Sequence, residues 1–258
     1  MYMKNVFVET ENVQRFQAAL GALERRGAKE NCLLVVDGKP GLGKTTALHR
    51  WATQTGAIYL RAKKEWKPGW FLSDLLAEFR VTPAHSYERR FAQAMEALLS
   101  RQSAMAVQKR TFAVVLDEAD HFSRNARIME TIRDFSDMGD IVFVLIGMGK
   151  IRDHLKLLPQ ISSRTQPAVQ FEPASLEDVR RFCEAMAEVP VGECLTGFVH
   201  HVTGGYNREI VEALKVIERF GKRNGAGPDR PVTLQDMAGQ VLVTDRRTGS
   251  PVIVPEMH

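Results

Sequence analysis

Cysteine is scarce in this chain, and the few cysteines present exclude two common uses of the residue. The 258 residues include three, Cys32, Cys183 and Cys194. An odd number argues against a disulfide framework, and the spacing matches no metal-binding pattern. We therefore expect buried thiols in a reducing compartment.

Long hydrophobic runs are also missing. No segment approaches the ~20 apolar residues that a transmembrane helix needs. The first residues, Met1–Lys4, lead into a mixed segment without the apolar centre of a secretory signal. The sequence also lacks internal repeats and low-complexity tracts. These absences argue against a membrane or secreted protein, and we expect a cytoplasmic location.

A strong excess of one charge is the third missing feature. The chain has 35 Lys+Arg and 31 Asp+Glu, a net charge of +4 and a pI near 9.0. A mildly basic chain is compatible with nucleic-acid binding but does not by itself argue for it. The apolar content of 44% is typical of a globular protein with a substantial core.

One complete motif is present. The segment Gly38–Thr45 reads GKPGLGKT and matches the phosphate-loop pattern G-x-x-x-x-G-K-[ST] without a mismatch. The apolar run Cys32–Val36 before it predicts a buried strand, and Thr46–Ala52 after it has helical spacing. In this context the loop amides face a polyphosphate, Lys44 reaches the β- and γ-phosphates, and the Thr45 hydroxyl binds Mg²⁺. The residues expected to bind ATP with Mg²⁺ are Gly38, Pro40, Gly41, Leu42, Gly43, Lys44, Thr45 and Thr46, together with Asp117.

Two carboxylates follow a second apolar strand. Val114–Leu116 precedes Asp117 and Glu118, and the carboxyl end of a parallel strand is where a bound triphosphate lies. We assign Asp117 to Mg²⁺ and Glu118 to polarisation of the attacking water. The letters Asp117–Asp120 also match the signature of DEAD-box helicases. We reject that interpretation because such helicases need two sheet domains, and this chain has room for one.

Strands and helices alternate up to Pro173. The pattern predicts strands at residues 32–36, 57–61, 111–116, 141–146 and 168–171, and helices at 10–27, 46–52, 71–79, 86–99 and 128–135. This alternation predicts an α/β fold with a parallel sheet over residues 1–172. Beyond Pro173, Ser175–Asp178 and Thr233–Asp236 look like capping boxes, with helices near Glu193–Val202 and Arg208–Phe220. We expect an all-helical lid domain over residues 173–243, followed by a tail, 244–258, of open role.

The order of these elements resembles that of the AAA+ ATPases, a class of P-loop NTPases with a five-stranded parallel sheet and a small helical lid. In that family the strand Ile141–Ile146 ends in a polar sensor, but here Gly147–Lys150 follows and the usual Asn, Ser or Thr is missing. Arg164 matches the place of an arginine finger that acts on a neighbouring subunit's ATP. Arg208 matches the sensor arginine of the lid. An ordinary surface charge is the alternative for both arginines. The resemblance thus implies the catalytic set Lys44, Glu118, Arg164 and Arg208.

A narrower resemblance is to the transposition ATPases of the phage Mu B and TnsC type, with the IstB helper ATPases more distant. It rests on the phosphate loop with Leu116–His121, Leu145–Gly149, Ser162–Arg164 and Thr203–Gly205. The resemblance implies a homo-oligomer that assembles with ATP as a filament or ring on duplex DNA, marks target DNA and activates a transposase in the cytoplasm of a bacterial host. The Mu protein has an additional amino-terminal DNA-binding domain, for which we expect no room here.

The most basic loop near the predicted sheet is the candidate DNA surface. Lys63, Lys64 and Lys67 are interleaved with Trp66 and Trp70. Ammonium groups there contact phosphates without reading sequence. The alternative is that the tryptophans pack onto the domain while the lysines are solvated, and the sequence favours neither. A second candidate patch consists of Arg124 and Arg127.

Two other functions stay open at this point. One is a nucleotide-switched adaptor, such as a helicase loader, and the other is a small-molecule phosphotransferase. The Asp117–Glu118 pair argues against the phosphotransferase, because a base beside the metal ligand suits water activation. Arg164 argues against any monomeric enzyme, since a finger acts on a neighbour.

Overall fold

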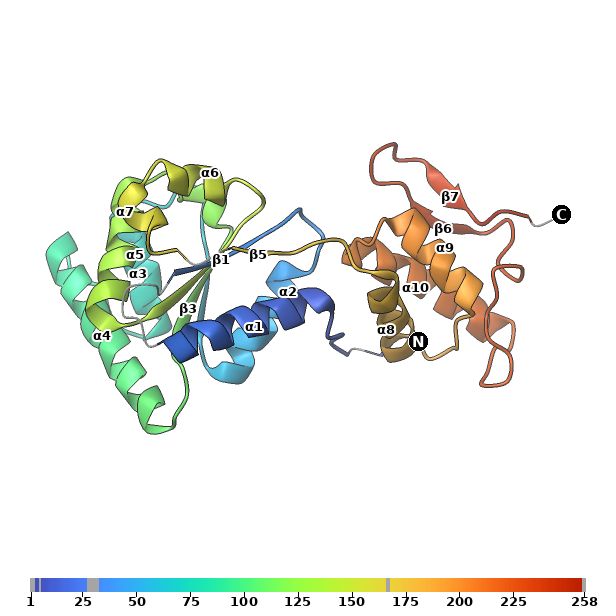
Figure 1. Cartoon of the computed structure of the whole chain (residues 1–258), viewed down its shortest axis with the longest axis horizontal. Coiled ribbons are helices and arrows are strands. Elements are labelled where there is room, and N and C mark those ends of the chain that lie inside the picture. The colour runs from blue at the N-terminus through green and yellow to red at the C-terminus, as the bar shows by residue number, and fades with distance from the viewer. Residues whose placement is uncertain (1–2, 5, 27–32, 166–167, 257–258) are drawn as a thin grey trace. The chain divides into compact units, whose positions relative to one another are not determined.

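The computed structural model describes residues 3–4, 6–26, 33–165 and 168–256 (Figure 1). Cys32 and the helix end predicted near Gly27 lie outside these residues. The chain forms two compact units, which we define by their residues: the sheet unit is Phe16–Lys39 with Lys44–Phe171, and the helical unit is Met1–Arg15, Pro40–Gly43 and Glu172–His258.

A parallel sheet forms the centre of the sheet unit. Its five strands have the order β2-β3-β4-β1-β5, and each adjacent pair is parallel. The predicted α/β fold with a five-stranded parallel sheet is therefore confirmed. The strands are β1 (Leu33–Asp37), β2 (Ile58–Arg61), β3 (Ala113–Asp117), β4 (Val142–Ile146) and β5 (Val169–Gln170). The helices are α1 (Glu11–Arg26, which spans the boundary of the units), α2 (Lys44–Thr55), α3 (Pro68–Glu78), α4 (Tyr87–Val107), the 3₁₀ helix η1 (Ala119–His121), α5 (Ala126–Gly139), α6 (Ile151–Lys156) and α7 (Pro159–Ser162).

The three central strands are almost entirely buried, which explains their largely apolar sequences; in β4 the first residue, Val142, is partly exposed. Every residue of β1 and β3 is buried, as expected for parallel strands covered by helices on both faces. Phe71 of α3, Leu98 of α4 and Phe135 of α5 lie in the same core as the β3 and β4 side chains. Because all five strands run the same way, the segments that follow β1, β2, β3 and β4 leave the same edge of the sheet. The candidate site therefore lies at this edge.

Side-chain caps begin several of the helices. The Ser86 side chain accepts a hydrogen bond from Arg89 N at the start of α4, and Asn125 accepts one from Ile128 N at the start of α5. The sequence pattern predicts that α4 ends at Leu99, but the helix continues to Val107. The pattern does not predict the short helices α6 and α7, because six and four residues are too few to show a helical period.

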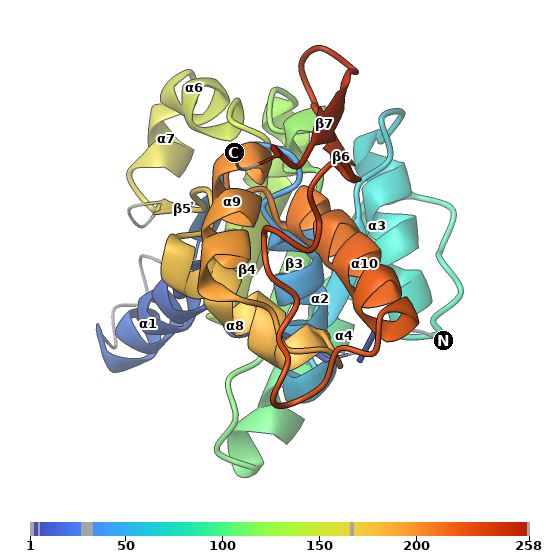
Figure 2. The same cartoon turned by 90° about the vertical axis from the view of Figure 1, so that its right-hand side faces the viewer.

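Three helices and a hairpin are the main regular elements among the described residues of the helical unit (Figure 2). They are α8 (Leu176–Met186), α9 (Glu193–Thr203), α10 (Asn207–Arg223), β6 (Val241–Thr244) and β7 (Pro251–Ile253). The apolar faces of the helices meet in a core that includes Val179, Val199 and Leu214. Of the capping box predicted at Ser175, the N-cap half is confirmed, since the Ser175 hydroxyl accepts a hydrogen bond from Asp178 N at 3.2 Å, whereas the Asp178 carboxylate accepts its hydrogen bond from Glu11 N.

The segment after α10 differs from the sequence expectation in two ways. Thr233 and Asp236 exchange the hydrogen bonds of a capping box, but no helix follows. Gly239 has a φ of 73°, a left-handed conformation that a right-handed helix does not continue through. The tail then forms the antiparallel β6–β7 hairpin, with Val243 and Val254 buried. The carboxyl-terminal unit is thus not purely helical.

The expectation that the cysteines are buried is confirmed at one described position and wrong at another. Cys183 is buried, and burial raises the pKa of its thiol to about 11. Cys194 is exposed. Among the helices of the described residues, none combines the length and apolarity needed to cross a bilayer.

Candidate nucleotide-binding site

The phosphate loop connects β1 to α2 and depends on its glycines. Gly38, Gly41 and Gly43 have φ values of 150°, 92° and 83°, which side chains rarely adopt. At Gly38 a Cβ atom would also stand 2.5 Å from the carbonyl oxygen of Phe171. The loop therefore passes so close to the strand-β5 segment that only glycine fits. The helix that follows presents its free N–H groups at the loop, as an anion site requires.

Lys44 is held inside the loop. Its Nζ donates hydrogen bonds to the carbonyl oxygens of Gly38, at 2.5 Å, and Lys39, at 2.8 Å. Burial lowers the pKa of this ammonium, although Asp37, Asp117 and Asp120 act in the opposite direction. The side chain thus lies folded back over the loop and partly desolvated, in a position to donate to a phosphate oxygen instead of the two carbonyls.

Asp117 and Thr45 are brought together although 72 residues separate them. The Thr45 hydroxyl donates to Asp117 Oδ2 at 2.9 Å, and Tyr59 donates to the same oxygen at 2.5 Å. Burial and this hydrogen bond raise the pKa of Tyr59. A hydroxyl and a carboxylate oxygen are ligands that Mg²⁺ accepts while it keeps water and phosphate oxygens. This pair therefore fits a Mg²⁺ ion bound together with a nucleotide.

Glu118 has a left-handed backbone conformation, and its carboxylate pairs with Arg61. Its φ of 57° and ψ of 38° are left-handed, a conformation that non-glycine residues adopt rarely and often at functional sites. Its carboxylate accepts hydrogen bonds from Arg61 Nε at 3.1 Å and Nη2 at 2.5 Å. The hydrogen bond to Glu118 is also the main cause that raises the pKa of Arg61. Sequence reasoning missed Arg61, which meets Glu118 only because β2 pairs with β3.

Two aspartates to which the sequence assigns no role hold the segment after β4. Asp120 accepts hydrogen bonds from Met148 N and Lys150 N, and Asp37 accepts one from Gly149 N. The sensor position lacks a polar side chain, and its backbone is held by two carboxylates, that of Asp37 at the end of β1 and that of Asp120 in η1. Asp37 is also visible in the sequence as the residue directly before the phosphate loop.

The two arginines assigned by resemblance lie in different units. Arg164 follows α7 in the sheet unit, where its Nη1 donates to Asp137 of α5 at 2.5 Å, and its side chain is 36% exposed. Arg208 is exposed in the first turn of α10. The structure therefore leaves the arginine-finger and sensor roles as predictions.

The basic loop after β2 divides into a packed part and an exposed part. Trp66 is 5% exposed, and its Nε1 donates to Asp74 at 2.7 Å. Lys63 forms an ion pair with the same carboxylate at 2.8 Å. Trp66 is thus a core residue, as the packing alternative had it, whereas Lys64 and Lys67 are exposed and Trp70 is 53% exposed. The cationic part of the loop outside this ion pair is therefore smaller than the sequence suggested, and within it the Lys67 ammonium lies 5.8 Å from the centre of the Trp70 ring.

The second candidate patch is also partly engaged. Arg124 Nε donates to His154 Nε2 at 2.8 Å, and the Arg127 guanidinium lies 4.5 Å from the centre of the Tyr87 ring. Burial lowers the pKa of His154, with Arg124 the next cause. A neutral His154 suits its role as the acceptor of this bond.

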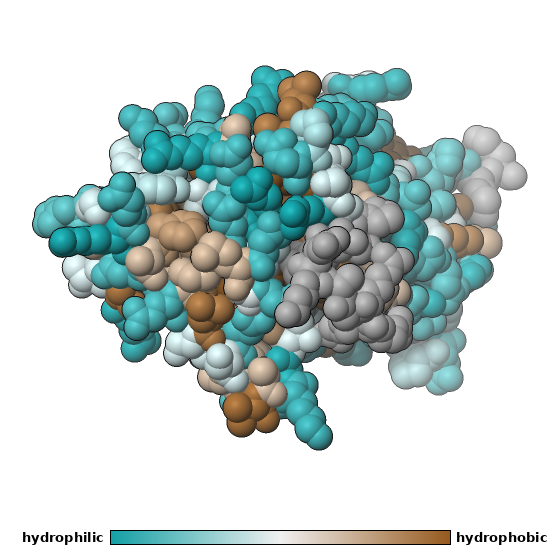
Figure 3. All heavy atoms as spheres, turned by 60° about the vertical axis from the view of Figure 1, so that its left-hand side comes forward, coloured by the Kyte–Doolittle hydropathy of each residue, from teal (hydrophilic) through white to brown (hydrophobic). Residues whose placement is uncertain are grey.

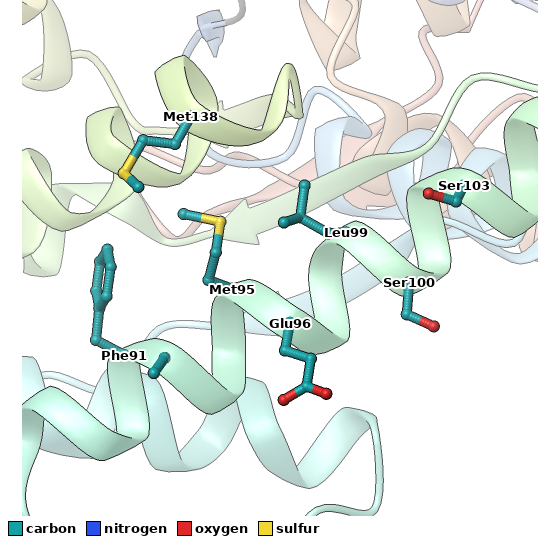
Figure 4. A pocket seen from close by; sticks show the side chains of 8 residues that line it. Phe91, Met95, Glu96, Leu99, Ser100, Ser103 and Met138 are labelled. Carbon is teal, nitrogen blue, oxygen red and sulfur yellow. The ribbon is translucent and has the colours of Figure 1, made fainter.

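An apolar pocket of about 630 Å³ lies along α4 and α5 of the sheet unit. Figure 4 shows Phe91, Met95, Leu99 and Met138 around it, with Glu96 and serines on the adjacent surface of α4. On the face of the molecule in Figure 3, hydrophobic residues form separate patches within a largely hydrophilic surface. None of the lining residues belongs to the phosphate loop or the acid pair.

Within the described residues, no group of three or more His, Cys, Asp or Glu side chains could hold a metal ion.

Comparisons with known proteins agree with this geometry. The model of a family described as "AAA domain" matches residues 26–155. The Mu-like prophage FluMu DNA transposition protein B of Haemophilus influenzae is 29% identical over 126 residues, which cover 49% of this chain and 41% of that protein. The chain therefore spans about two fifths of the length of this curated relative.

Solved structures share the fold at low sequence identity. Cdc6p from Pyrobaculum aerophilum has a TM-score of 0.60 at 15% identity, covering 92% of this chain and 70% of that one. The Aeropyrum pernix ORC1 protein, solved in complex with DNA, has a TM-score of 0.57 at 20% identity, covering 89% and 64%. At these identities the similarity shows the fold alone.

Proposed function

The chain belongs to the AAA domain family, and from that premise we propose that it is an ATP-dependent DNA-binding ATPase that assembles on duplex DNA and regulates transposition. Family membership implies nucleotide binding and ATPase activity in general. Our proposal adds Mg²⁺ dependence, assembly of copies as a filament or ring, binding to DNA of any sequence, and activation of a transposase in the bacterial cytoplasm.

The observation that carries the proposal is the pairing of Thr45 with Asp117 beside the buried Lys44. A Mg²⁺ ion at this pair would neutralise charge on the β- and γ-phosphates. Lys44 would donate to those phosphates, and Glu118 would orient and polarise a water molecule for in-line attack. The chain's own residues thus supply a metal site, a cation and a base at one edge of the sheet.

DNA binding and the link to transposition have separate support. A curated relative is named as a DNA transposition protein, and a structure with the same fold was solved with DNA bound. In this chain, Lys64, Lys67 and Trp70 follow the carboxyl end of β2 with exposed side chains. Exposed ammonium groups bind DNA phosphates whatever the base sequence, and an exposed aromatic ring can stack or pack against nucleic acid.

The experiment that tests the proposal measures the assembly state of the protein. The purified protein should be examined by sedimentation and negative-stain imaging with duplex DNA, with a slowly hydrolysed ATP analogue, with both and with neither. Polymers that form only when both are present support the proposal. A particle that responds to the analogue but ignores DNA would support the nucleotide-switched adaptor instead.

Arg164 provides a prediction about assembly. Arg164→Ala should reduce ATP turnover at least tenfold and weaken assembly, because a guanidinium that reaches a neighbour's γ-phosphate stabilises transition-state charge. Nucleotide binding by the monomer should stay within about twofold. Turnover and monomer affinity can be measured on the same preparation.

Asp137→Asn is the control for Arg164. It removes the ion pair that Arg164 makes within its own chain but keeps the guanidinium. If Arg164 is only a surface charge, both variants should behave alike, with changes of stability of ~1 kcal/mol or less. Unchanged turnover in Arg164→Ala would contradict the finger role.

The exposed lysines provide a prediction about DNA. Replacing both Lys64 and Lys67 with glutamate should weaken DNA affinity at least tenfold for every sequence tested. The slope of log affinity against log salt should become shallower by about 0.9 for each phosphate that the variant no longer neutralises. Fluorescence anisotropy with two unrelated duplexes at several salt concentrations measures both quantities.

Lys109→Glu is the matched control for these lysines. Lys109 is exposed and precedes β3, so it lies toward the amino ends of the parallel strands, whereas Lys64 and Lys67 follow a carboxyl end. If the lysine pair lowers the logarithm of the affinity by only about twice as much as Lys109→Glu, in proportion to the charge changed, the response reflects net charge, and the DNA surface lies elsewhere.

A further inference from the structure

The carboxyl-terminal hairpin contacts the phosphate loop. Within the helical unit, Arg246 follows β6 and its Nη1 donates a hydrogen bond to the carbonyl oxygen of Pro40 at 3.0 Å. These residues are 206 positions apart in the chain. A Cβ atom at Gly41 would lie 3.2 Å from the same nitrogen. The tail, for which the sequence indicates no role, thus brings a cation to the tip of the loop.

Neighbouring side chains hold the Arg246 guanidinium in place. It lies over the Tyr206 ring, 4.4 Å from its centre, and its Nη1 is 3.8 Å from Glu209 Oε1. A planar guanidinium that stacks on a ring and faces a carboxylate loses much of its freedom before it makes its hydrogen bond. Arg246 is therefore an oriented donor, although 45% of its side chain is exposed.

A second side chain of the helical unit, that of Asn207, binds the Leu42 carbonyl of the phosphate loop. Asn207 Nδ2 donates to the carbonyl oxygen of Leu42 at 3.3 Å. A Cβ atom at Gly43 would stand 2.6 Å from this nitrogen. The Pro40 and Leu42 carbonyls are therefore both bound by side chains of the helical unit, one from the tail and one from the start of α10.

Because the peptide bond is planar, each of these hydrogen bonds to a carbonyl also fixes the direction of an N–H group. In a trans peptide the carbonyl and the following N–H point in opposite directions. Fixing the Pro40 carbonyl therefore fixes the Gly41 N–H, and fixing the Leu42 carbonyl fixes the Gly43 N–H. Both glycines have left-handed φ values and many alternative conformations. Loop amides of this kind are the donors that cradle the α- and β-phosphates.

From this geometry we propose that Arg246 is a positioning residue for nucleotide binding: it holds the Pro40 carbonyl so that the Gly41 amide points at the phosphates. The inference rests on the nucleotide binding of the proposed function but not on DNA binding or assembly. Because the amides serve the α- and β-phosphates, ADP and ATP depend on Arg246 equally. A side chain that contacts the γ-phosphate would instead affect only ATP.

The test compares Arg246→Ala with Arg247→Ala, its exposed neighbour in the same turn. We expect Arg246→Ala to raise the Kd of a fluorescent ADP analogue and of a non-hydrolysable ATP analogue by about tenfold each, because the loop would then populate other conformations and the nucleotide would have to order it. Arg247→Ala should change neither by more than twofold. Arg246→Lys keeps the charge without the stacking plane and should recover only part of the affinity.

Several outcomes would overturn the inference. An unchanged Kd for ADP, a loss restricted to the ATP analogue, or an equal loss in Arg247→Ala would each contradict a positioning role. So would a loss of DNA affinity with unchanged nucleotide affinity, which would assign Arg246 to a DNA surface. Because the Arg246 contacts are present without nucleotide, the thermal unfolding midpoint of Arg246→Ala should fall by a few degrees at most, and a lowered midpoint with unchanged nucleotide affinity would assign Arg246 a purely structural role. If Arg246→Ala weakens ADP binding while the unmodified protein never assembles on DNA, the proposed DNA function fails and this inference stands.

Discussion

Lys44→Ala should lower the affinity for ATP by at least a hundredfold. The ammonium is buried against the carbonyls of Gly38 and Lys39, so its donors are placed before the nucleotide arrives. Each hydrogen bond from a charged donor is worth ~1.5–3 kcal/mol, and two such bonds to phosphate oxygens account for a hundredfold or more. Equilibrium binding of a fluorescent ATP analogue measures the effect.

The control for Lys44 is Lys39→Ala. Lys39 is exposed in the same loop and takes part through its backbone carbonyl, which the substitution keeps. We expect its affinity for ATP to stay within about threefold of that of the unmodified protein. If Lys44→Ala bound ATP as tightly as Lys39→Ala, the phosphate loop would not be the nucleotide site.

Glu118→Gln should bind ATP normally and hydrolyse it at least a hundredfold more slowly. A general base contributes about 10²–10⁴ to a rate, and an amide of the same shape cannot accept the proton. Slower hydrolysis should also prolong the assembled state on DNA, because the nucleotide would remain a triphosphate. Single-turnover hydrolysis and the lifetime of the assemblies are the two measurements.

Glu96→Gln is a suitable control for this substitution, because Glu96 is an exposed carboxylate of α4 outside the acid pair. ATP hydrolysis by a variant of Arg61, the partner of Glu118, should be measured in parallel. Arg61 binds the Glu118 carboxylate with two donors, and the amide of Glu118→Gln weakens that pair while it removes the base. Hydrolysis by Glu118→Gln at the rate of the unmodified protein would show that another group activates the water.

Much of the fold could be predicted because its signals are local. The strands at β1, β3 and β4 are short apolar runs, since strands buried on both faces have no polar side to show. The phosphate loop could be recognised because its chemistry requires a fixed order of glycines, lysine and threonine in consecutive positions. The pairing of this loop with Asp117 was expected, because the carboxyl ends of parallel strands lie at the same edge of the sheet.

The interactions around the site could not be predicted in the same way. Arg61 reaches Glu118 because β2 lies beside β3 in the strand order, which no local pattern encodes. Lys63 and Trp66 had the composition of a DNA-binding loop, yet one nearby carboxylate, Asp74, binds both. A charge pattern does not reveal which of its members already have partners.

By itself, the sequence of this protein determined the α/β architecture and the groups that can bind a triphosphate, because hydrophobic period and phosphate chemistry act over a few consecutive residues. Only the tertiary structure decided which side chains hold those groups. Arg61 and Glu118, and likewise Arg246 and Pro40, are far apart in the chain, and their hydrogen bonds arise from strand pairing and from the packing of the helical unit.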